Sequence, residues 1–257
     1  MNVLVLLAAI LFILMIVIGG KKGARSFISL FLNFGVLFVA VVLMADPNFS
    51  PIIVTLIASI IIASITLFFI NEVNSKTIAA FVSTIVAIAI LLIFIVLVTK
   101  TTMIQGFGKE EIEEHTIFSF YIGVDFIQIA TSMIIMSTIG AIMEVAISIA
   151  ASVHEIHNQN PTISRKNLFA SGVAIGRDIL GTDTNTLFFA FFGGYLGLLL
   201  WFKDLSYSFG EIINSKIFSG EITMILCAGI GIALIIPIAS WISTYYMMKS
   251  TQKDETA

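Results

Sequence analysis

Charge is the scarcest feature of this chain. Of its 257 residues only 11% are charged, whereas soluble proteins carry about 25%. Hydrophobic residues make up 58% of the sequence and the mean hydropathy is +1.07. One soluble core cannot hide so much apolar surface. The composition therefore predicts an integral membrane protein.

Other absences narrow the function. The net charge is -3 and no basic cluster is present, so the sequence offers no surface for nucleic acid. Dinucleotide-binding, Walker A, zinc-protease and lipase motifs are missing; we therefore expect no cofactor and no enzymatic activity. The single cysteine, Cys227, excludes an internal disulfide and lies in an apolar run, as a small buried side chain does.

What remains is a series of apolar runs, each near the roughly 20 residues that cross a membrane as a helix. We predict an all-α, polytopic bundle that forms one transmembrane domain over residues 1–257. Four closely spaced helices occupy 1–98, and the helices with polar motifs occupy 118–248. The seven expected spans are 3–18, 27–44, 51–70, 77–98, 124–151, 184–202 and 222–248.

The connections carry further expectations. The acidic stretch KEEIEEH within 99–116 is expected to be a solvated loop or a short interfacial helix. Residues 118–123 are placed near the membrane surface and 168–180 in an amphipathic piece before the sixth span. The region 118–157 fits either one long helix or a span with a re-entrant segment.

Positive residues orient the spans. The positive charges near the first run follow it, unlike those of a cleavable signal, so we expect an uncleaved span. Because cytoplasmic loops are enriched in Lys and Arg, the N-terminus is predicted outside and the C-terminus inside. The loops and tail that support this orientation contain Lys21, Lys22, Arg25, Lys76, Arg165, Lys166, Lys249 and Lys253.

The ionisable side chain of Glu144 lies in the interior of the fifth span. A carboxylate at bilayer depth costs about 2.5 kcal/mol or more, so Glu144 should face other helices or water instead of lipid. Helical spacing places Ser137, Gly140, Ser148 and Glu155 on the same side. The carboxyl group is interpreted as a proton carrier, as an ion ligand aided by hydroxyl groups, or as a structural group bonded across a helix pair.

A second polar cluster, GRDILGTDTNT, lies at 176–186. If it is helical, Asp178, Thr182 and Asn185 share one face, which could meet the Glu144 stripe. A break at Gly181 would instead leave backbone groups that must line a cavity. Arg177 and its neighbour Asp178 cannot pair along one helix, so partners from other spans are implied. The cluster is either a functional polar site or an interfacial lock.

Two weaker patterns have structural interpretations. Gly172 and Gly176 have the spacing that lets membrane helices approach closely, and packing is their expected role. The HEIH sequence at 154–157 departs from the HExxH spacing of zinc sites, so no metal is expected there.

Two stretches resemble the YibE/F-like family of membrane proteins: GAIMEVAISIAASVHEI at 140–156 and SGVAIGRDILGTDTNTLFFAFFGGYLGLLL at 171–200. Weaker similarity extends over the last five spans. Family members usually have aspartate at the position of Glu144 and an apolar residue at that of Asp183. The resemblance is to a short, YibF-like member in a bacterial plasma membrane, and it implies a longer companion protein with an extracytoplasmic domain.

A more distant similarity covers 140–187, whose motif order is similar to that of SecD/SecF and resistance-nodulation-division exporters. Two membrane helices of those exporters relay protons. The similarity implies that Glu144 is the proton-carrying acid. Its polar partners would be Asp178, Thr182, Asn185 and Thr186.

The sequence thus favours a multi-pass transporter or exporter subunit that works with a companion in the bilayer, with Glu144 as the group for proton coupling. Its cargo would be a proton or a small molecule, lipid or peptide. The alternative is a non-transporting scaffold or assembly subunit. The proposed pathway residues are Glu144, Ser148, Asp178, Thr182, Asn185 and Thr186, and the proposed packing or interfacial residues are Gly140, Gly172, Gly176, Arg177 and Gly181.

Overall fold

The computed structural model describes residues 2–106, 123 and 125–254, with side chains to residue 249. All regular structure in these residues is helical, which confirms the predicted all-α class. The helices are α1 (Val3–Met44), α2 (Pro51–Ser64) with the π-helical turn η1 (Ile65–Phe69), α3 (Ser75–Thr102), α5 (Phe126–Gln159), α6 (Arg165–Gly194), α7 (Leu196–Asp204), α8 (Phe209–Asn214) and α9 (Lys216–Asp254).

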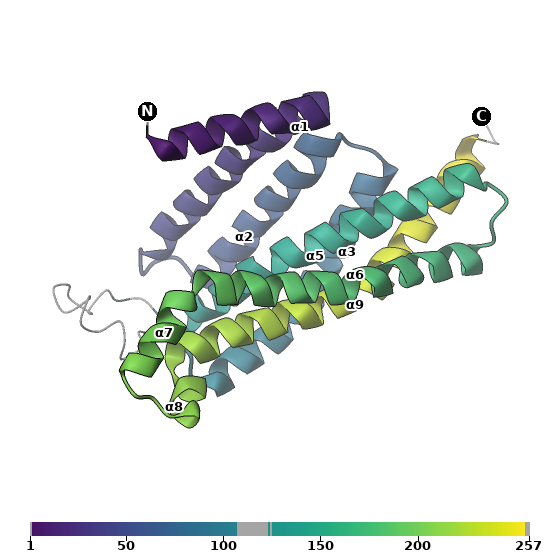
Figure 1. The fold of residues 1–257 in the computed structure, drawn as a ribbon. Coiled ribbons are helices and arrows are strands. Elements are labelled where there is room, and N and C mark those ends of the chain that lie inside the picture. Colours follow the sequence, from purple (N-terminus) through teal and green to yellow (C-terminus); the bar gives the residue numbers. More distant parts are fainter. Residues whose placement is uncertain (1, 107–122, 124, 255–257) are drawn as a thin grey trace.

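Helix α1 consists of two arms that meet at an acute angle (Figure 1). Gly20 makes the break with a φ of 55°, a conformation that favours glycine. The arms then pack so closely that a Cβ on Gly23 would collide with the carbonyl of Met15. Phe12 and Phe27 also pack across the hairpin, with ring centroids 4.7 Å apart. The first two expected spans are therefore the arms of one broken helix.

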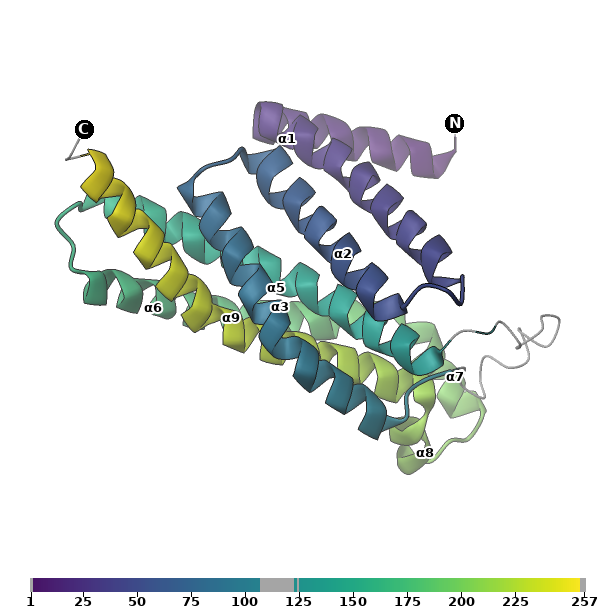
Figure 2. The ribbon, with the colours of Figure 1, turned by 180° about the vertical axis from the view of Figure 1, so that it is seen from behind.

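The core lies between α3, α5, α6 and α9. Figure 2 shows α3 running between α2 and α9, and α5 packs extensively against both α3 and α9. Small residues allow this packing: a Cβ on Gly231 of α9 would lie 2.9 Å from Thr138 and 3.0 Å from Ile142 of α5. By contrast, the first arm of α1 is exposed along almost its whole length.

Within the described residues, five helical segments are long and apolar enough to cross a membrane: 3–44, 51–69, 75–102, 126–159 and 216–249. Helices α6 and α7 make a sixth if they are counted together, although they are bent by 53°. The multi-span bundle is confirmed. The expected number of seven differs because α1 is continuous apart from Gly20, so the polar stretch after the first run is helical.

The sixth span differs most from expectation. Ser164 caps α6 by accepting a hydrogen bond from the Asn167 amide, and the helix then continues to Gly194. The break at Gly181 that was considered does not occur; the chain bends instead at Tyr195. Residues 168–180, expected as a separate amphipathic piece, belong to the same helix. Polar and charged side chains do not by themselves end a helix. The backbone N–H and C=O groups of 176–186 remain hydrogen-bonded within α6, so the helix continues through this cluster.

The fifth span is one helix over 126–159, where Asp125 caps its first turn. Its last turns include the HEIH sequence, which lies beyond the end of the expected span 124–151. No re-entrant segment is present within 126–157. The proposed interfacial position of 118–123 and the acidic stretch 109–115 lie outside the described residues, apart from Gly123.

Charged contacts gather at one end of the molecule, here called the basic end and defined by Arg25, Glu72, Arg165, Tyr245 and Lys249. Arg25 pairs with Glu72 at 2.8 Å, which links α1 to the connection before α3. Arg165 and Lys249 lie over the Tyr245 ring, 5.7 and 5.8 Å from its centroid. Loops that were predicted to share the cytoplasmic side thus lie together (Figure 1).

At the opposite end, two hydrogen bonds join segments that are distant in the sequence. Ser50 donates to the Gln128 side chain at 2.9 Å, joining the connection after α1 to the beginning of α5. Lys216 donates to the Gln105 carbonyl at 3.1 Å, joining α9 to the end of α3.

Candidate functional site on α5 and α6

The predicted polar residues of α5 and α6 lie at the same depth. These helices are antiparallel neighbours, and Gly172 packs against Val153 so closely that a Cβ would lie 3.0 Å from it. Glu144 is nine residues before Val153, and Gly181 is nine residues after Gly172. Because both helices rise about 1.5 Å per residue, Glu144 is level with Gly181, between Asp178 and Thr182 in the register of α6.

This level is near the middle of the bundle. Gly231 packs against Ile142, which is half a turn from Glu144. Gly231 itself lies close to the centre of the apolar segment 216–249 of α9. Glu144 is therefore near the middle of the bundle along its length.

Glu144 belongs to an exposed stripe on α5. Met133, Ser137, Gly140 and Glu144 are all exposed, and they follow one another at intervals of four, three and four residues. Their neighbours on the other side of α5 are buried in the core. The described helices of this chain thus leave the stripe uncovered. A Cβ on Gly140 would meet no atom within 4 Å.

Helix α6 is also exposed on one side and packed on the other. On the packed side, a Cβ on Gly172 would lie 2.8 Å from the Ser240 hydroxyl, and one on Gly176 would collide with Ile236. Both glycines therefore lie where α6 packs closely against α9. Gly181, by contrast, has no atom within 4 Å of such a Cβ. The exposed residues include Arg177, Asp178, Gly181, Thr182, Asn185 and Thr186.

No side chain in the described part of the chain bonds to Glu144, Arg177 or Asp178. The hydroxyl groups are used locally: Ser148 donates to the Glu144 carbonyl at 2.8 Å, and Thr186 to the Thr182 carbonyl at 3.0 Å. The structure therefore brings the predicted residues to one level on adjacent helices without joining their side chains. We refer to the exposed residues Ser137, Gly140, Glu144, Asp178, Gly181, Thr182, Asn185 and Thr186 as the polar face.

Asp183 occupies a different position from Asp178. Helical spacing places it on the side of Gly172 and Gly176, and its side chain is half-buried. Asp183 therefore lies on the packed side of α6, whereas Asp178 is exposed. The family resemblance did not indicate this difference between the two carboxylates.

The sequence did not predict the hydrogen-bonded pair of Tyr195 and Glu221. The Tyr195 hydroxyl donates to the Glu221 carboxylate at 2.9 Å, between the end of α6 and the second turn of α9. A lone acid near the beginning of an apolar segment was the available signal. Its partner is set only by the bend after Gly194, which the sequence did not reveal.

The HEIH sequence lies on the last turns of α5 at the basic end. His154 Nδ1 is 3.0 Å from the Met247 sulfur, and His154 Nε2 is 3.1 Å from the Asn158 amide nitrogen. Within residues 2–106 and 125–249, no three His, Cys, Asp or Glu side chains lie close enough to hold a metal ion.

Comparison with known proteins identifies the family. A model of the YibE/F-like protein family matches residues 7–249, which include the polar face and nearly all of the helices. The chain belongs to the YibE/F-like protein family. No curated protein and no solved structure matches it. For this YibE/F-like chain, the family match and the helical structure together establish a multi-pass membrane protein in contact with lipid.

Proposed function

We propose that this protein is a subunit of a membrane transporter or exporter whose polar face is completed by a second membrane protein. The observation that carries the proposal is the position of Glu144, which is exposed at mid-depth with no partner among the described side chains. An ionised carboxylate facing lipid there would cost about 2.5 kcal/mol or more. A neighbouring protein surface or enclosed water removes that cost.

The spacing of the α5 stripe supports a helix as the covering element. Intervals of four and three residues generate the seam at which two helices pack side by side. Gly140 is in the middle of the stripe and has open space above it, so a second helix can approach closely. The longer companion implied by the YibE/F-like resemblance is our proposed partner, in the plasma membrane of a bacterium.

A companion that covers the polar face would enclose Glu144 on α5 and Asp178, Thr182 and Asn185 on α6 in a setting with little water. Carboxyl groups in such settings carry protons or bind cations in transporters. We propose that Glu144 takes up and releases a proton as the two proteins change their packing, and that the α6 residues hydrogen-bond to the water or cargo that passes.

A scaffold function is the second candidate, and the hydroxyl groups favour it. Ser148 and Thr186 already donate to carbonyl groups of their own helices. They therefore have no hydrogen left for a relay, and the polar face would bind the companion without conducting anything.

Exchange of Glu144 for Gln separates these functions. The protein is reconstituted with its companion in vesicles that contain a pH-sensitive dye. We expect E144Q to keep the complex intact and to lose proton flux almost completely. The matched control is E155Q, on the same side of α5 near the basic end, where Glu155 accepts from Gln159 at 2.8 Å. Normal flux in E144Q refutes proton coupling, and loss of the complex favours the scaffold.

A further inference from the structure

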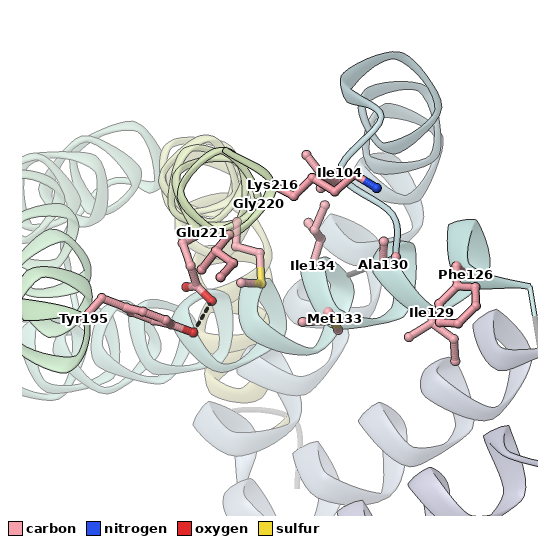
Figure 3. A pocket seen from close by; sticks show the side chains of 13 residues that line it. Ile104, Phe126, Ile129, Ala130, Met133, Ile134, Tyr195, Lys216, Gly220 and Glu221 are labelled. Carbon is pink, nitrogen blue, oxygen red and sulfur yellow. Dashed lines mark hydrogen bonds between the residues drawn. The ribbon is translucent and has the colours of Figure 1, made fainter. Parts of the chain in front are cut away.

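A cavity of about 270 Å³ lies at the end of the molecule opposite the basic end. Figure 3 shows its lining residues from close by. The cavity lies between the first half of α5, the beginning of α9 and the end of α6, and it is separate from the polar face in depth. Figure 3 shows Tyr195 and Glu221 on one side, with Lys216 and Ile104 on the other.

The anionic side of the cavity is held in place by the fold. Glu221 is half-buried, and one of its oxygens accepts the Tyr195 hydroxyl at 2.9 Å. No described residue donates to the other oxygen, Oε2. A carboxylate can accept about four hydrogen bonds. Glu221, which lines the cavity, therefore keeps the capacity to accept further hydrogen bonds.

On the cationic side of the cavity, Lys216 already has a hydrogen-bond partner. The Lys216 ammonium group donates to the Gln105 carbonyl at 3.1 Å, and the side chain is exposed. Water screens an exposed charge much more strongly than a half-buried one. Glu221 consequently dominates the recognition of charge within the cavity.

The remaining walls are apolar and adaptable. Ile129, Met133, Ile134 and Met224 line the cavity, and the methionine side chains can adjust to different shapes. Gly220 also lines it, and a Cβ at this position would meet no atom within 4 Å. The volume is slightly below the range of about 300–1,000 Å³ for drug-sized ligands, which favours a small molecule.

From this geometry we propose that the cavity binds a small amphipathic amine. The ammonium group donates to Glu221 Oε2, and the apolar body lies against the isoleucine and methionine side chains. Met133 also belongs to the exposed stripe of α5, so the bound molecule would contact the beginning of that stripe. Binding at this cavity does not depend on the proposed function, because it requires neither the companion nor transport.

The probe for this proposal is 2-phenylethylamine, titrated calorimetrically into the purified full chain in detergent and corrected with empty micelles. The neutral comparator is 2-phenylethanol, which has the same apolar body. We expect the amine to bind at least about tenfold more tightly than the alcohol, because charge-assisted hydrogen bonds contribute about 1.5–3 kcal/mol.

Two variants test the location. E221Q removes the charge and should weaken amine binding about tenfold or more. G220L fills the cavity from a position with free space and should abolish binding of both compounds. The control E155Q, at the basic end, should bind as the unmodified protein does. Equal binding of amine and alcohol, unchanged binding in either G220L or a folded E221Q, or no binding to the unmodified protein would overturn the proposal.

Discussion

Glycine occurs on both faces of α6, in contrasting surroundings. Gly176 is buried against Ile236 of α9, where even a methyl group would collide. Gly181, five residues later, would have no neighbour within 4 Å of an added methyl group and is flanked by the exposed Asp178 and Thr182. One face shows how small residues serve packing inside a chain. On the other face, Gly181 has no packing partner in the described part of the chain, as expected if the proposed companion covers it.

The largest effect should come from placing the same side chain on each face. G176V must displace the Ile236 side chain, and overpacking of this kind costs about 1–3 kcal/mol. G181V has the same change in helix propensity but no collision. Thermal unfolding in detergent, followed by circular dichroism, should show a lower Tm for G176V than for G181V. Equal Tm values for the two variants would show that the two faces of α6 do not differ in packing.

The next effect concerns the companion. G140L adds a bulky side chain to the open stripe of α5, so the isolated chain should keep its Tm. A helix packed on Gly140 would be displaced, and we expect the yield of the copurified complex to fall roughly tenfold. The control is A233L, an exposed position of α9 two residues from Gly231 and on the other side of that helix. Undiminished copurification of G140L would show that the stripe is not the contact.

The smallest effect is a pH dependence at a contact that the chain completes by itself. Asp125 caps α5 by accepting from the Ile127 and Gln128 amides at 2.9 and 3.3 Å. The Gln128 side chain, which also donates to it, is the main cause of a pKa below the usual value, with the backbone amides adding to the effect. The carboxylate therefore stabilises the fold above its unfolded pKa, and this contribution is lost as the pH falls through its folded pKa.

The cap contributes about 1 kcal/mol, so D125A should lower the Tm slightly at neutral pH. D125N keeps a capping oxygen and should remove part of the acid dependence below about pH 4. Melting curves of both variants and the unmodified chain over this range test the prediction. Identical acid dependence in all three proteins would assign it to other carboxyl groups.

The sequence was sufficient for features that depend on periodicity. Apolar runs predicted a helical membrane bundle, and the 100° spacing correctly grouped Ser137, Gly140 and Glu144 on one side of α5. The GxxxG spacing of Gly172 and Gly176 also indicated their close packing. Periodicity identifies which residues share a face, but not what the face contacts.

Features set by tertiary contacts were not predictable in this way. The bend of the sixth span occurs at Tyr195 and not at Gly181, although glycine is present in both regions. The hydrogen bond from Tyr195 to Glu221 joins residues 26 positions apart and depends on that bend. Likewise, Gly20 rather than the following lysines ends the first arm of α1, because one left-handed residue reverses the chain without a loop.

The order of the helices has a consequence for biosynthesis. Helix α9 follows α3, α5 and α6 in the chain, yet it packs against all three and contributes Gly231, Ile232, Ile235 and Ile236 to the centre of the bundle. Until the ribosome has released these residues, α3, α5 and α6 can pack against one another but lack the contacts that each makes with α9. We therefore expect a nascent chain stalled before α9 to form a less compact bundle and to be cleaved faster by membrane proteases than a chain that includes α9.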